Sequence, residues 1–292
     1  MEWLQRISIT CFTASYLVVL ALEISRTVFL AKWFKWIAVT ATVAGLFAHV
    51  VYLALQEFAI DGNGLMVGGW TGWFLAVSLV TIVIYLVLLL RHESSVVSLY
   101  LVPLALLAIA IGSWPGQNNS FSIRETRTIW NTIHGLSFLF STVVVGLGFL
   151  FGIMYLAQAR RLKKGQILKI RMPSLEWLQL SGEKTLWTSA ALLSVGVVSG
   201  VAINLINRSQ GEGILPWLDP VIWTSSILLG WLIVSIVFHW LYKTSRPGRK
   251  ISYLVMSCFI FLALEIGLVI FSGHATEKSS SQATLQVDRE QT

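Results

Sequence analysis

Charged side chains are scarce in this chain of 292 residues. Only 12% of the residues are Asp, Glu, Lys or Arg, and 55% are hydrophobic, whereas about a quarter of the residues of a soluble domain are charged. This excludes an ordinary soluble domain and indicates a membrane protein, provided that the apolar residues form runs long enough to span a bilayer. The net charge of +7 would suit a nucleic-acid partner, so the basic residues must first be placed along the chain.

Cysteine is almost absent. The two cysteines, Cys11 and Cys258, lie in apolar runs and form no CxxC pair, which excludes a thiol–disulfide redox motif within the chain. We expect both to be small buried apolar residues. The sequence also shows no pair of general acid and base groups and no activated nucleophile. Catalysis by this chain alone is therefore not predicted.

Long apolar runs are what the chain does contain. A transmembrane helix needs about 20 mostly apolar residues. The runs that qualify number eight and cover residues 7–24, 33–55, 70–90, 96–112, 130–157, 184–204, 218–242 and 251–272. The sequence therefore predicts an all-α integral membrane protein, a bundle of about eight transmembrane helices in one domain. The linker 160–183 is too polar to cross and is predicted to hold a short interfacial helix over residues 175–180.

Lysine and arginine are divided unevenly between the two sides of this predicted bundle. The loops after the first, third, fifth and seventh runs hold 15 of the 21 basic residues. Because cytoplasmic loops carry the excess of Lys and Arg, these loops are predicted to be cytoplasmic and both termini to lie outside. Topology thus accounts for the positive charge. The lipid bilayer is the expected partner, and nucleic acid is not.

Two histidines are predicted at the outer ends of helices. His134 lies at the start of the fifth run and His274 at the end of the eighth, and the loop before the seventh run carries Trp217, Asp219 and Trp223 on the same side. Two imidazoles at one depth, beside aromatic side chains, suit six-coordinate ligation of a haem iron. Zinc would need three or four protein ligands. The alternative is that the two histidines are unrelated structural residues.

Two further histidines lie inside apolar runs. His239 is near the inner end of the seventh run, and His49 is in the outer half of the second. An ionisable residue within a span is by default a functional-site hypothesis. At a rise of 1.5 Å per residue, His49 lies about 24 Å above the start of its helix, and His239 about 6 Å from the inner end of its own. The two are therefore not expected to share one iron.

Three motifs carry a resemblance to a known family. The run 133–141, Ile-His-Gly-Leu-Ser-Phe-Leu-Phe-Ser, leads through its helix into a basic linker. The segment 200–223 contains Trp-Leu-Asp-Pro at positions 217–220, and the run 271–274 reads Phe-Ser-Gly-His. On these motifs the chain resembles the cytochrome c assembly protein family, the integral-membrane haem handlers, from about the second helix to His274.

The resemblance implies a haem site. The residues that it assigns to haem are His134, His274, Trp217, Asp219, Trp223, His239 and His49. The first two are implied to be the outer axial ligands of a haem b iron, and the Trp-rich loop is implied to contact the haem. His239 is implied to belong to a haem path through the membrane, with His49 as a weaker candidate partner.

The implied function is haem handling in cytochrome c assembly, in a bacterial plasma (inner) membrane. A second assembly subunit and apocytochrome c are the implied protein partners, and the chain would be at most part of a cytochrome c haem lyase system. Leu218 interrupts the Trp-Asp pair. Such a degenerate loop is typical of the HemX-type branch, and the alternative function that it implies is a non-catalytic regulator or accessory subunit of haem synthesis or cytochrome assembly.

A small-molecule transporter is a third alternative, although no inverted repeat or pair of broken helices is visible. The cytochrome c assembly-type domain is expected over residues 1–275. The tail 276–292 is rich in Ser, Gln and Glu and is predicted to be a disordered outer segment.

Overall fold

The protein is all-helical over the part of the chain that the structure, a computed structural model, describes. That part comprises residues 8–28, 33–59, 70–91, 96–113, 129–165, 172–210, 220–242 and 248–267. Its labelled helices are α1 (Ile9–Val28), α2 (Trp33–Ala59), α3 (Trp70–Arg91), α4 (Val96–Gly112), α5 (Ile129–Lys163), α6 (Leu175–Gln210) and α7 (Pro220–Leu241). An eighth, here called the C-terminal helix, covers Gly248–Gly267.

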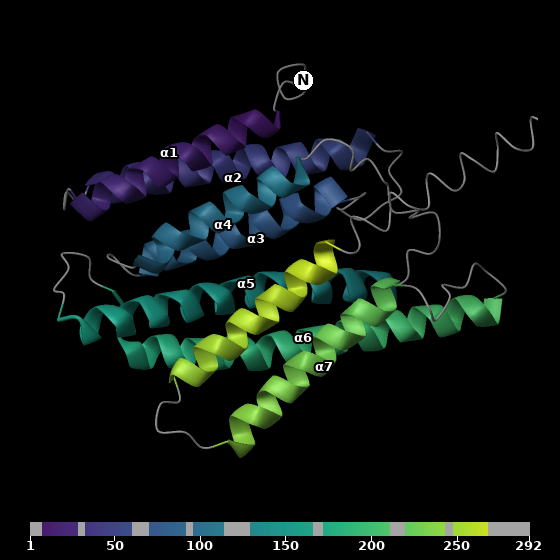
Figure 1. The fold of residues 1–292 in the computed structure, drawn as a ribbon. Coiled ribbons are helices and arrows are strands. Elements are labelled where there is room, and N and C mark those ends of the chain that lie inside the picture. The colour runs from purple at the N-terminus through teal and green to yellow at the C-terminus, as the bar shows by residue number, and fades with distance from the viewer. Residues whose placement is uncertain are drawn as a thin grey trace, which may run out of the picture.

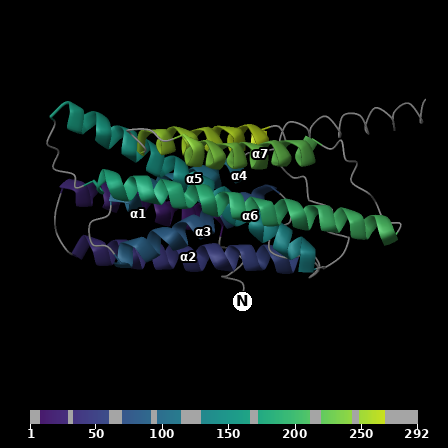
Figure 2. The same ribbon diagram turned by 90° about the horizontal axis from the view of Figure 1, so that it is seen from below.

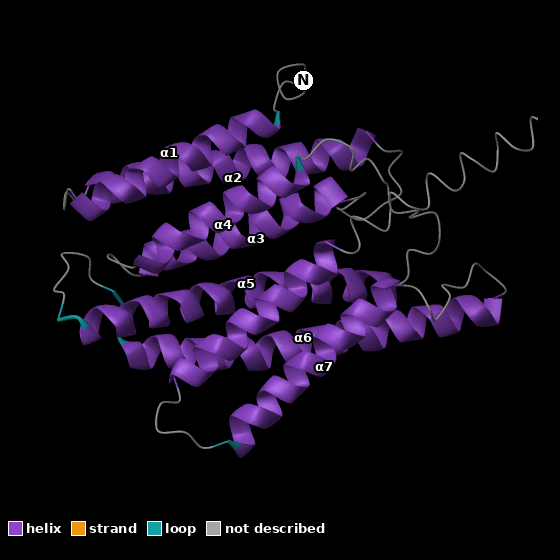
Figure 3. Cartoon of the chain, viewed as in Figure 1, coloured by secondary structure: helices purple, strands orange, loops and turns teal. Residues whose placement is uncertain are grey.

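The predicted membrane bundle is confirmed. Within the described ranges the chain has no strand (Figure 3). Seven of these helices are long and apolar enough to cross a membrane, and α4 is a shorter apolar helix. The helix positions follow the apolar runs of the sequence, because each run buries one side and offers the other to lipid.

The helices form two groups that lie side by side in Figure 1. The N-terminal half holds α1–α4, and the C-terminal half holds α5–α7 and the C-terminal helix. Apolar side chains of α3, α4 and α5 join the halves, among them Phe74, Val77, Ala108, Leu139 and Val143. Consecutive helices run in opposite senses, with α7 and the C-terminal helix inclined to α5 and α6 (Figure 1), so the helix ends lie toward two ends of one bundle (Figure 2).

Basic side chains gather at one of these two ends, here called the basic end. They include Arg26, Arg91, Arg160, Lys163, Arg249 and Lys250, which lie in the last turns of α1, α3 and α5 and the first turn of the C-terminal helix. Arg208, in the last turn of α6, lies at the opposite end. The alternation of basic and less basic loops along the sequence therefore places most of the described basic side chains at one end of the bundle.

Two helices exceed the length expected from the sequence. α5 has 35 residues and α6 has 36, which is about 53 Å each at 1.5 Å per residue and more than the about 40–45 Å of a whole bilayer. The prediction of a separate short helix over residues 175–180 is wrong, since these residues are the start of α6. Ser174 begins α6 by accepting a hydrogen bond from the Trp177 amide at 3.2 Å, as an N-cap does.

The two cysteines differ. Cys258 is buried, as expected, but Cys11 is exposed on α1. The expectation that both are buried is wrong for Cys11, because an apolar run in a membrane helix has a face toward lipid as well as a face toward the bundle.

Candidate functional site

His134 lies at the start of α5, at the end opposite the basic end. Its Nδ1 is 2.8 Å from the carbonyl oxygen of Gly196 on α6. A carbonyl can only accept, so Nδ1 carries the hydrogen and donates it. In the neutral ring the lone pair is then on Nε2, the arrangement found in histidines that ligate metals. The α5–α6 contact therefore holds the imidazole with its ligand-binding nitrogen free of this bond.

Two glycines of α6 make this close approach possible. A Cβ atom on Gly200 would lie 2.9 Å from Cε1 of His134, and one on Gly196 would lie 2.7 Å from the Phe138 ring. Both distances are too short for a side chain, so the rings of His134 and Phe138 occupy space that only glycine leaves. The two rings are themselves 4.8 Å apart. The signal missed in the sequence is this Gly-x-x-x-Gly spacing, which marks close helix approach in membranes.

Serines add polar contacts between and within α5 and α6. Ser199 donates to the same Gly196 carbonyl at 2.8 Å, so that oxygen accepts from two side chains. Ser141 of α5 donates to the carbonyl of Ser189 on α6 at 3.3 Å. These serines are nearly fully buried. The α5–α6 interface therefore combines these polar contacts with apolar packing, and the orientation of His134 depends on it.

The C-terminal helix ends beside this site. Ile266 packs against Leu139 and Val143 of α5, and Leu139 lies about 8 Å along α5 from His134. The neighbouring Glu265 accepts a hydrogen bond from the hydroxyl of Ser225 on α7. This bond ties the start of α7 to the end of the C-terminal helix.

Of the loop tryptophans, only Trp223 lies in a described range. It is on α7 and its side chain is 55% exposed, so it is not packed within the bundle. The remaining predicted outer-site residues, which lie outside the described residues, are Trp217, Asp219 and His274. The structure therefore describes one of the two predicted ligands.

His239 lies at the basic end and is not near His134. Its Nε2 is 3.2 Å from Oε1 of Glu183 on α6. Lys250 of the C-terminal helix donates to the carbonyl oxygen of His239 at 2.9 Å. His239 thus belongs to a polar junction of three helices at the opposite end of the C-terminal half.

His49 lies in the N-terminal half and is fully buried. Its ring stacks on Phe12 with 4.2 Å between centroids and 2° between planes, and Nδ1 is 3.1 Å from the hydroxyl of Tyr16. Its Nε2 is buried and has no hydrogen-bond partner among the described residues. A ligand as large as haem could reach this ring only if α1 and α2 separated. His49 and His239 lie in different halves of the bundle, on α2 and α7.

The described residues contain no group of three or more His, Cys, Asp or Glu side chains that could hold a metal ion. A haem iron needs only axial ligands from the protein, and His134 fits that requirement because its Nε2 is left open. Comparisons of the chain with protein-family models, with curated proteins and with solved structures give no match.

Proposed function

We propose that this chain binds haem b at the outer face of a bacterial plasma membrane and handles it in cytochrome c assembly. The observation that carries the proposal is the hydrogen bond of 2.8 Å from His134 Nδ1 to the Gly196 carbonyl. It selects the tautomer whose Nε2 lone pair is available and holds the ring at one orientation. Such a bond supports ligation, because it orients the imidazole and leaves Nε2 for the iron.

The roles within the proposed site follow from the residues. His134 supplies one axial nitrogen, and Gly196 and Gly200 give its ring room against α6. His274 is the proposed second ligand, with Trp217, Asp219 and Trp223 against the haem plane and His239 on its path through the membrane. Bound haem would supply the vinyl groups that an apocytochrome's reduced thiols attack. This chain would hold and orient the haem, with a second assembly subunit presenting the apocytochrome.

Orientation is part of the proposal. The excess of Lys and Arg at the basic end favours a cytoplasmic position for that end. Ile9, where α1 begins, and Gly267, the last described residue of the C-terminal helix, lie at the opposite end (Figure 1). Both termini and His134 would then face outward.

A HemX-type regulator is the second candidate. The observation that favours it is the group of exposed cations at the end of α5, Arg160, Lys163 and Lys164. The ion pairs found in the described ranges are Arg26–Glu23 and His239–Glu183, so this group has no acidic partner there. An acidic surface of a haem-synthesis enzyme would complement it, and charge reversal at these three residues would then abolish function while His134→Ala left it intact.

The test is an absorption spectrum of the purified protein with added haem b. The proposal expects Soret and α/β bands of a low-spin, six-coordinate iron, because two imidazoles are strong axial ligands. His134→Gly should lose these low-spin bands. Imidazole added to that variant should restore them, because it occupies the space that the side chain leaves and ligates the iron in its place. His274→Ala should give a high-spin spectrum. A preparation that stays colourless after added haem would overturn the proposal.

A further inference from the structure

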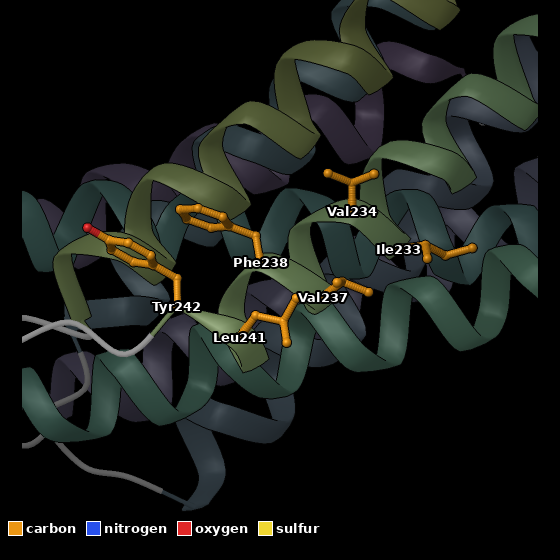
Figure 4. Close-up of a pocket in the computed structure, with 6 residues that line it drawn as sticks. All are labelled: Ile233, Val234, Val237, Phe238, Leu241 and Tyr242. Carbon is orange, nitrogen blue, oxygen red and sulfur yellow. The ribbon is translucent and has the colours of Figure 1, made fainter.

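A groove runs along one side of α7 near the basic end. It has a volume of about 390 Å³ and is lined by Ile233, Val234, Val237, Phe238, Leu241 and Tyr242. Figure 4 shows these six side chains along one side of the helix. The rings of Phe238 and Tyr242 lie nearly parallel with 5.2 Å between centroids, and they form the groove's aromatic wall.

The lining faces away from the bundle. Its side chains are 44–66% exposed, whereas Leu228, Leu232 and Ser235 on the other side of α7 are 6% exposed or less. Since α7 is apolar and long enough to span a membrane, the groove lies where hydrocarbon meets the protein. Water is absent at that depth, so an apolar chain is the occupant that the lining fits.

A cation stands at the mouth of the groove. Lys250 Nζ lies 5.8 Å from the centroid of the Phe238 ring. The same ammonium donates to the carbonyl oxygens of His239 and Tyr242 at the end of α7. An ammonium has three donors, so one remains for an acceptor outside the protein. The two carbonyls fix its position, which removes most of the cost of ordering it on binding.

The acidic side chain at this junction is not on the groove side of α7. Glu183 of α6 contacts the His239 ring on the side of α7 that faces α6, and neither residue lines the groove. The adjacent Arg249 is exposed and adds a second positive charge at the same level. An apolar groove with a fixed cation at its interfacial end is complementary to a lipid that has a negative head group and a long chain.

We propose that this groove binds one anionic phospholipid, with an acyl chain along Val234, Val237 and Leu241 and the phosphate on Lys250. The charge complementarity at the mouth favours this occupant over a neutral lipid. The site is separate from the proposed outer haem site at His134, because it lies on the outside of α7 at the other end of the bundle, although Lys250 also contacts the backbone of His239.

The experiment is native mass spectrometry of the full chain in detergent with equal amounts of palmitoyl-oleoyl phosphatidylglycerol and palmitoyl-oleoyl phosphatidylcholine. The two lipids share their chains and differ in charge. We expect the phosphatidylglycerol adduct to dominate, and Lys250→Gln to lower its excess about fivefold, the effect of one basic residue near a membrane surface. Lys250→Arg should keep the excess, because charge and donors remain.

Two more variants separate a built site from general attraction. Arg249→Gln removes the same charge one residue away and should leave the excess within about twofold. Val237→Trp fills the groove and should lower the adducts of both lipids.

Three results would overturn the proposal. They are equal binding of the two lipids, an equal loss in Arg249→Gln and Lys250→Gln, and unchanged binding in Val237→Trp. A protein dimer that forms in place of the adducts and is broken by Val237→Trp would overturn it in favour of a second copy of the chain. If Lys250→Gln does not fold, the proposal is tested by the retained phosphatidylglycerol excess in Lys250→Arg and by the loss of lipid adducts in Val237→Trp.

Discussion

His49 and His134, one in each half of the bundle, are held in opposite ways. His49 is fully buried, stacked on Phe12 and bonded to Tyr16 through side chains of α1. His134 is only partly buried, and the bond that holds it goes to the backbone of α6. Side chains therefore cover the His49 ring on several sides, whereas the backbone contact of His134 uses only its Nδ1 edge and leaves the Nε2 edge free of that contact.

A similar difference separates the surroundings of Glu23 in the N-terminal half from those of Gly196 in the C-terminal half. In the N-terminal half, Glu23 is 4% exposed and joins Arg26 and Tyr85, each at 2.7 Å. These groups satisfy one another inside the bundle. At the end of the C-terminal half opposite the basic end, the Gly196 carbonyl accepts from His134 and Ser199. The first half is therefore closed around its polar groups, and the ligand-binding surface that we propose lies in the second.

The largest effect is expected from Glu23→Leu. It leaves Arg26 and the Tyr85 hydroxyl in the membrane region without their carboxylate, and breaking a buried pair from one side costs about 3 kcal/mol. The measurement is the free energy of unfolding in detergent with increasing denaturant. Glu176→Leu is the control, because Glu176 is exposed in the first turn of α6 and should cost less than about 1 kcal/mol. Equal costs for the two variants would remove the distinction between a closed N-terminal half and an open surface.

A smaller effect is expected from Gly200→Ala in the C-terminal half. Its Cβ would lie 2.9 Å from the His134 ring, so the ring must move off the Gly196 carbonyl at a cost of about 1–3 kcal/mol. Gly230→Ala is the matched control, since nothing lies within 4 Å of a Cβ there. We expect a lower unfolding temperature and weaker haem binding in Gly200→Ala, and no change of either quantity in Gly230→Ala. If both variants bind haem as the original chain does, the ring does not depend on this contact.

The smallest effect on stability is expected from His49→Leu. It removes the bond to Tyr16 and leaves that hydroxyl unpaired, at a cost of about 1 kcal/mol. The apolar contact with Phe12 is retained in part. Haem titration should be unchanged, in contrast to His134→Gly. A loss of the haem spectrum in His49→Leu, with folding intact, would show that the N-terminal half also takes part in binding.

The helices could be predicted from the sequence because each apolar run must satisfy its backbone within the membrane. The ends of α5 and α6 could not, because hydropathy reports contact with lipid and not the end of a helix. Past the apolar run, α5 continues through Arg160 and Arg161, both good helix formers. It stops at Gly165, whose φ of 65° is the left-handed conformation of a helix C-terminus. Gly165 and Ser174 were visible in the sequence as local signals, independent of hydropathy.

The candidate site could be predicted only in part. His134 was identifiable because a histidine at the end of a span is unusual, but its partner is a backbone carbonyl, which every residue has. The Gly-x-x-x-Gly spacing of Gly196 and Gly200 is a sequence signal that predicts close approach of another helix. The pairs His239–Glu183 and Ser225–Glu265 join residues 56 and 40 positions apart, and no local pattern predicts which side chains two packed helices bring together.

One helix touches both ends of the C-terminal half. α6 meets His239 through Glu183 and meets His134 through Gly196, and the two contact points are about 20 Å apart along its axis. The helix is continuous between the two contacts, so this part of α6 moves as a rigid body. A rotation of α6 about its axis, or a slide along it, alters both contacts in the same movement, and each histidine is mechanically linked to events on the other side of the membrane.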